Sequence, residues 1–90
     1  MSKVRIDVTR EDIDAGEPGH PDSCAINLAA SRAFPGVGCR TLRAQLVVGD
    51  SSHVADLPRE AIDFIWRFDM RHWDLCVPFS FEIENPLVGS

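Results

Sequence analysis

The sequence predicts a small α+β fold, a two-layer sandwich in which an antiparallel sheet packs on helices. Residues 3–8 and 75–84 alternate between apolar and polar side chains, as half-buried strands do. Residues 23–34 are apolar on almost every side and residues 57–69 along one wide stripe, which are the patterns of a buried and a half-buried helix. With a short helix and a hairpin between these segments, we expect the order β-α-α-β-β-α-β.

Length and composition fit one small domain over residues 1–90, with residues 85–90 as a flexible tail. The net charge is −5 and the sequence has no basic run, which argues against a protein that binds nucleic acid. Residues 1–8 lack the apolar core of a signal peptide, and no apolar stretch is long enough to cross a membrane. The three cysteines do not suggest a disulfide framework, so we expect a cytoplasmic protein.

Residues 23–34 should form the central, buried helix. Asp22 or Ser23 is the expected N-cap residue. Pro35 and Gly36 should end the helix, because proline cannot continue it and glycine relaxes the backbone.

The first strand leads into a short helix over residues 9–15. Thr9 with Asp12 three residues later approximates a capping box, with Asp in place of the usual Glu or Gln. Gly16 should end this helix as its C-cap.

Residues 41–48 and 51–55 should form a hairpin that turns at Gly49-Asp50. The side chains expected to face inward from the first of these strands are Leu42, Ala44, Leu46 and Val48. A two-residue loop would place His53 on the apolar face, and one extra loop residue would place Val54 there instead. We prefer the longer loop, because valine suits the interior better than histidine.

The third helix should begin near Pro58 and run to Asp69, with Trp66 near its boundary and residues 70–74 as a connector. The last strand then alternates over residues 75–84. Its expected apolar face is Leu75, Val77, Phe79, Phe81 and Ile83, and its polar face is Cys76, Pro78, Ser80, Glu82 and Glu84. Because Pro78 cannot donate a hydrogen bond to a neighbouring strand, this strand lies at a sheet edge or has that backbone position pointing away from its neighbour.

This order of motifs resembles a group of small, mostly uncharacterised proteins encoded by phages and prophages. They share a strand, a T-x-E-D-I-x-x-G turn, a cysteine-led apolar helix, an L-P-x-x-A/V-x-x-F-I-x-x-F-D helix and a P-F-x-F ending. The matching segments here are residues 9–16, 24–29, 57–69 and 78–83. The chain departs from the pattern at Ala25, where proline often follows the cysteine, and in residues 70–74. The resemblance implies a phage origin and a setting in the host cytoplasm, and it carries no assigned activity.

A metal or thiol site is one alternative function. His20 and Cys24 are four residues apart and are both zinc ligand types, but zinc sites usually show paired ligands at short spacing. Cys24 also lies at a helix start, where a thiol pKa is lowered, with His20 as the nearest base. We interpret Cys24 as a packing residue and expect no metal and no cofactor.

The clearest candidate for a binding surface lies where the third helix meets the connector. The residues that we assign to it are Trp66, Arg67, Met70, Arg71, His72 and Trp73. Tryptophan and arginine are enriched in interface hot spots, although Trp66 could instead complete the core and Trp73 could fold back on the helix. Exposure of Trp73 beside Arg71 would favour the contact site.

We therefore expect a non-enzymatic phage accessory protein that binds a host protein and alters host physiology or defence. A second hypothesis is a structural module that self-associates, as a homodimer, through an edge strand containing residues 77–83.

Overall fold

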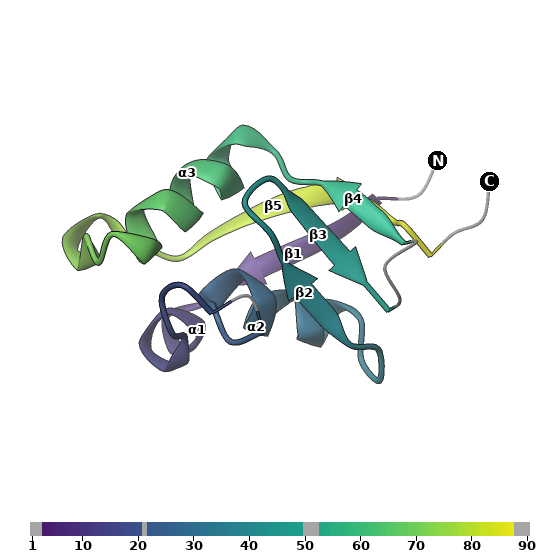
Figure 1. Cartoon of the computed structure of the whole chain (residues 1–90), viewed down its shortest axis with the longest axis horizontal. Coiled ribbons are helices and arrows are strands. Elements are labelled where there is room, and N and C mark those ends of the chain that lie inside the picture. Colours follow the sequence, from purple (N-terminus) through teal and green to yellow (C-terminus); the bar gives the residue numbers. More distant parts are fainter. Residues whose placement is uncertain (1–2, 21, 50–52, 88–90) are drawn as a thin grey trace.

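The computed structural model describes residues 3–20, 22–49 and 53–87, and it confirms the α+β class with antiparallel sheets packed on helices (Figure 1). The elements are β1 (Lys3–Val8), α1 (Arg10–Ala15), α2 (Ala25–Ala33), β2 (Cys39–Thr41), β3 (Gln45–Val48), β4 (Val54–Asp56), α3 (Arg59–Asp69), the 3₁₀ helix η1 (Trp73–Leu75) and β5 (Phe79–Glu84). The strands form two sheets, β1-β5 and β2-β3-β4, and β2 is an element that the sequence analysis missed. Within the described ranges, no helix has the length and apolar character that a membrane span requires.

The β1-β5 sheet has one buried and one charged face. The buried face contains Ile6, Val8, Phe81 and Ile83, each at most 5% exposed. On the outer face, Lys3 pairs with Glu84 and Arg5 with Glu82 in the antiparallel register. Opposite charges across a strand pair stabilise this register. The first and last strands of the chain therefore close one side of the core.

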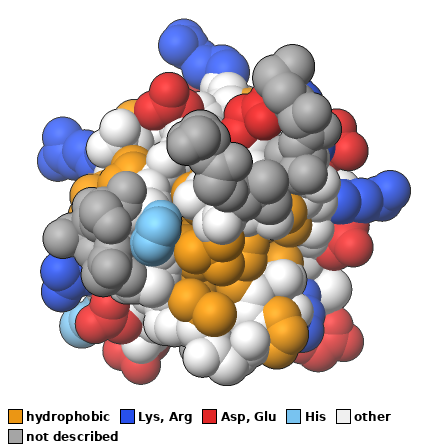
Figure 2. All heavy atoms as spheres, turned by 90° about the vertical axis from the view of Figure 1, so that its right-hand side faces the viewer, with side chains coloured by type: hydrophobic (Ala, Val, Ile, Leu, Met, Phe, Trp, Pro, Cys, Tyr) orange, Lys and Arg blue, Asp and Glu red, His pale blue; other side chains and the backbone are white. Residues whose placement is uncertain are grey.

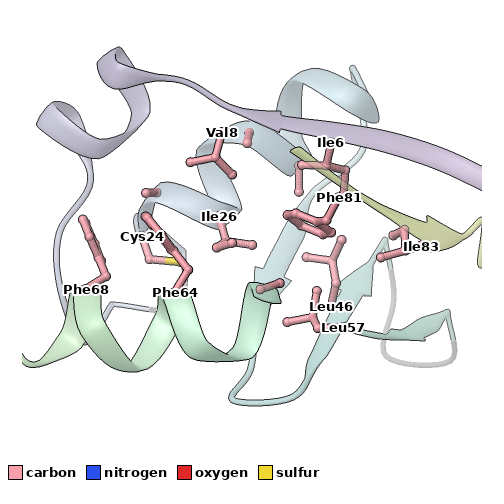
Figure 3. Close-up of a cluster of buried hydrophobic side chains, with 14 of the residues drawn as sticks. Ile6, Val8, Cys24, Ile26, Leu46, Leu57, Phe64, Phe68, Phe81 and Ile83 are labelled. Atoms are coloured by element: carbon pink, nitrogen blue, oxygen red, sulfur yellow. The ribbon is translucent and has the colours of Figure 1, made fainter. Parts of the chain in front are cut away.

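Helix α2 is the centre of the core, as predicted. Ala25, Ile26, Ala29 and Ala30 are all at most 2% exposed, and the helix packs on β1, β2 and α1. Figure 3 shows Ile26 and Cys24 pointing toward side chains of α3 and of the β1-β5 sheet. The helix ends at Ala33, shortly before Pro35, which confirms the predicted end of the helix.

The predicted N-cap of α2 is wrong. Cys24 is the N-cap and makes no side-chain capping bond. The carbonyl of Asp22 instead accepts a hydrogen bond from Asn27 Nδ2 at 2.9 Å, and Asn27 Oδ1 accepts one from the Thr41 hydroxyl at 3.1 Å. The buried amide of Asn27 thus ties the helix start to β2, a tertiary link that a local capping rule does not see.

The capping box of α1 is confirmed and is part of a larger clamp. Thr9 Oγ1 accepts from the Asp12 backbone N–H at 3.2 Å, and Asp12 Oδ2 accepts from the Thr9 N–H at 2.9 Å. The Arg32 guanidinium binds both carboxylate oxygens of Asp12, and its Nη2 also donates to the Asp7 carbonyl at 2.9 Å. Burial alone would raise the pKa of the Asp12 carboxyl, but the bonds from Arg32 and Thr9 outweigh it and hold that pKa below its usual value.

The predicted strand over residues 41–48 is interrupted by a turn. Thr41 is opposite Leu46, and the Leu42 N–H donates to the Gln45 carbonyl at 2.8 Å, so the chain reverses at residues 43–44. Leu42 and Ala44 are therefore exposed, not inward as predicted. Residues 43 and 44 have no positive φ, so this turn needs no glycine or asparagine to mark it.

The preferred register of the next hairpin is also wrong. Leu46 is opposite Ala55, and Val54 is 38% exposed, so Ala55 takes the inward position. Four residues separate Val48 from His53, whose carbonyl accepts from the Val48 N–H at 2.8 Å. The loop is one residue longer than we expected, and this extra residue moves every side chain of β4 to the other face. The predicted turn residue Asp50 and strand residues 51–52 lie outside the described residues.

The last strand is shorter than predicted. It begins at Phe79, whereas Leu75 lies in η1 and Val77 is 55% exposed. Cys76 is fully buried, not on the polar face as predicted, because the 3₁₀ turn rotates the chain before the strand begins. In the expected tail, the Leu87 N–H donates to Asn85 Oδ1 at 2.9 Å, and residues 88–90 lie outside the described part of the chain.

Candidate functional site

All six predicted site residues lie on one stretch of chain at the C-terminal end of α3, and all are exposed. We call Trp66, Arg67, Met70, Arg71, His72 and Trp73 the α3-end surface. Helix α3 buries Ala61, Phe64 and Phe68 against the core. Trp66 and Met70 lie one turn apart on the helix and remain 59% and 55% exposed. Two large apolar side chains are thus held in water on a helix that is anchored from its other face.

The predicted connector after α3 has a defined structure, a Schellman motif. The His72 N–H donates to the Arg67 carbonyl at 2.9 Å, and the Arg71 N–H donates to the Phe68 carbonyl at 3.1 Å. Arg71 occupies the left-handed position of the motif, with φ of 60°. Glycine is usual there, and an L residue with a side chain costs about 1–2 kcal/mol in this conformation. The motif has no signature in the sequence, because arginine occupies the position where glycine is usual.

Two ring contacts fix the side chains around this turn. The His72 ring packs edge-on against Trp66 with centroids 5.5 Å apart. Trp73 packs edge-on against the buried Phe68 ring at 5.4 Å and is 46% exposed. Trp73 therefore folds back on the helix and still presents a large surface to solvent. These contacts hold Trp66, His72 and Trp73 of the α3-end surface in place.

A groove that the sequence analysis missed runs beside this surface. One cavity of about 300 Å³ is lined by Arg43, Ile62, Ile65, Trp66, Asp69 and Met70. A second cavity of about 210 Å³ shares Arg43, Ile65 and Asp69 with the first and adds His20, Cys24 and Leu42, among others. We call these two adjoining cavities the α3 groove. Leu42 and Arg43, at the start of the exposed turn, form the wall opposite the helix, and only the three-dimensional fold brings them there.

The thiol alternative finds His20 and Cys24 in the same cavity, but the chemistry is unfavourable. Cys24 is 7% exposed, and burial raises the pKa of its thiol despite the hydrogen-bond donors around it. A buried, protonated thiol is a poor nucleophile. Among the described residues, no three His, Cys, Asp or Glu side chains gather as a metal site would require.

The opposite end of the molecule, where the chain termini lie, also presents hydrophobic side chains. Figure 2 shows them gathered in one patch with a histidine at its border. We assign no site to this patch.

Comparison with known proteins identifies no family for this chain. No protein-family model matches the sequence, and no curated protein or solved structure is significantly similar to it. Its function is therefore inferred from the α3-end surface and the α3 groove.

Proposed function

We propose that this chain is a non-enzymatic binding protein that docks a partner protein on its α3-end surface. The observation that supports this proposal best is the joint exposure of Trp66 and Met70 beside Arg67 and Arg71. Tryptophan and arginine contribute most binding energy at protein interfaces, and a rigid aromatic side chain loses little entropy when it is buried. Burying these two side chains would remove a large apolar area from water, which favours association.

The backbone at Arg71 supports the same proposal. A residue in the left-handed region is strained unless it is glycine, and strained residues cluster at functional sites. Glycine at this position would make the helix end more stable, so the arginine side chain must contribute something other than stability. Its guanidinium makes no ion pair within the described residues, which leaves it available to a partner.

The resemblance to phage and prophage proteins provides the setting that we propose. The partner would then be a protein of the host cytoplasm, and binding would change host physiology or defence. Exposed aromatic and arginine side chains on one surface fit an accessory protein that acts by binding.

The proposal predicts that Trp66→Gln abolishes the capture of a partner from host lysate. Glutamine keeps the helix propensity and removes the exposed indole, so the fold should persist while at least tenfold of affinity is lost, as is typical of a hot spot. Affinity purification followed by quantitative mass spectrometry measures the recovery.

Val54→Thr is the matched control, because Val54 is also exposed but lies on β4. If Trp66→Gln and Val54→Thr recover the same partner in the same amount, the α3-end surface is not the docking site.

A further inference from the structure

We infer that the α3 groove binds an acidic segment of the partner protein, one that inserts apolar side chains into the groove and carries carboxylates beside them. This inference rests on the proposed function and names the chemistry of the partner. Two features of the groove carry it, its apolar lining and the arginines around it.

The apolar lining is contributed mostly by one side of α3. Ile62 and Ile65 are partly buried and pack on the core, while Trp66 and Met70 extend from the same side of the helix into solvent. Leu42 lines the adjoining cavity together with Ile65 and is 42% exposed. A groove with this lining recognises a peptide by large apolar side chains at its centre.

The charges around the groove differ from those elsewhere on the molecule. Across the described residues, Arg43, Arg67 and Arg71 are the basic side chains that make neither an ion pair nor a hydrogen bond. The others have partners: Lys3 with Glu84, Arg5 with Asp7, Arg10 with the Cys76 carbonyl, Arg32 with Asp12, Arg40 with Asp22 and Arg59 with Asp63.

All three unpaired arginines belong to the groove or to the surface beside it. Arg43 lines both cavities, and Arg67 and Arg71 come three residues before and one residue after Met70 in the chain. Arg67 also lines a separate cavity with Glu60 and Asp63. In a chain whose net charge is −5, such a cluster of uncompensated cations favours a partner with carboxylates at the matching positions. A basic segment would instead leave its own cations facing these arginines.

Asp69 is the carboxylate that lines the groove, and it already has a structural role. Its Oδ1 accepts a hydrogen bond from the Gly19 N–H at 3.0 Å, which holds the loop before α2 against the end of α3. That bond holds one wall of the groove in place and leaves the carboxylate its charge. Against this one carboxylate stand Arg43 in the groove and Arg67 and Arg71 in the α3-end surface, so the basic side chains outnumber it.

The test uses the ¹⁵N-labelled full chain and three 18-residue peptides. The first has leucine along one helical face and glutamate elsewhere, the second has lysine for every glutamate, and the third has serine for every leucine. We expect the glutamate peptide to shift the amide resonances of residues 42–43 and 62–70, and we expect little shift from the other two. Binding should weaken as salt is raised from 0.05 to 0.5 M, since screening lengths shorten over roughly this range.

The arginines are tested one at a time by Arg43→Gln and Arg71→Gln. Each should weaken the glutamate peptide about two- to fivefold, the usual effect of an exposed charge pair. Arg59→Gln removes the same charge from the other end of α3 and should change nothing. Equal binding of the lysine peptide, shifts that map elsewhere, absence of any shift at millimolar peptide, or equal effects of all three substitutions would overturn the inference.

A second copy of this chain is the competing occupant, and sedimentation decides it. A dimer that forms at micromolar concentration and is abolished by Trp66→Gln would overturn the inference. The two proposals also fail differently. Partner capture that needs Trp66 but tolerates Arg43→Gln removes only the acidic partner, whereas capture that tolerates Trp66→Gln removes the docking site itself.

Discussion

Arg32→Met is expected to lower the free energy of unfolding by about 3 kcal/mol, the low end for breaking a buried ion pair. Asp12 is only 3% exposed, and the substitution leaves its carboxylate buried without its counterion. The Asp7 carbonyl loses a donor as well. The loss stays at the low end because the Arg32 side chain is 52% exposed, so water already screens part of the pair. Urea denaturation of wild type and variant at neutral pH measures it.

The same clamp predicts a dependence on pH. The folded-state pKa of Asp12 lies below its ordinary value of 3.8, so its stabilising effect is complete above that value and is lost as the pH falls through the lower, folded-state pKa. Wild type should therefore lose stability in acid more steeply than Asp12→Asn.

Arg40→Met is the control for Arg32→Met, because the pair of Arg40 with Asp22 is exposed on both sides and should contribute less than about 1 kcal/mol. Equal losses for Arg32→Met and Arg40→Met would refute the clamp.

Phe68→Ala is the second large effect, with an expected loss of about 3–5 kcal/mol. Phe68 is 1% exposed, stacks on Phe64 with centroids 5.8 Å apart and supports Trp73. Because domains of this size have about 5–15 kcal/mol of stability, much of the population should unfold at physiological temperature. Guanidinium denaturation followed by tryptophan fluorescence measures both the loss and the exposure of Trp73.

Phe68→Leu keeps most of the buried volume and should lose only about 1–1.5 kcal/mol. An alanine variant as stable as the leucine variant would show that the ring fills no essential part of the core.

Signals within a few residues of one another predicted much of the fold. The alternation of residues 3–8, the apolar run of α2, and Pro35 after it each act through the nearest neighbours of the residues concerned. The capping box is equally local, since Thr9 and Asp12 satisfy each other's backbone groups. Such features survive in any fold that keeps the segment helical or extended.

The features that sequence reasoning missed depend on contacts between distant segments. The direction of Val54 follows from a loop length that no residue type encodes, and the turn at residues 43–44 has backbone angles that any residue can adopt. Cys76 faces inward because η1 precedes it, and the carbonyl of Cys76 is held by Arg10 from the other end of the chain. Neither feature has a local signature in the sequence.

The candidate site divides in the same way. The α3-end surface could be proposed because Trp66, Arg67 and Trp73 are close together in the sequence. The α3 groove could not be proposed in this way. Arg43 lies between β2 and β3, and Asp69 holds the Gly19 loop from 50 residues away in the chain. Nor did the sequence indicate that Arg71 takes a position where glycine is usual.

Arg71→Gly tests the central claim, that the α3-end surface is kept for binding, most directly. Glycine relieves the left-handed strain, and this gain exceeds the extra backbone entropy that glycine loses on folding. The variant should therefore be more stable by roughly 0.5–1 kcal/mol, which corresponds to a Tm about 2–8 °C higher. Partner capture by the same variant should fall, because the guanidinium beside Met70 is gone. A variant with a higher Tm and weaker capture is the result that we predict, and a variant with a higher Tm and unchanged capture would contradict the claim.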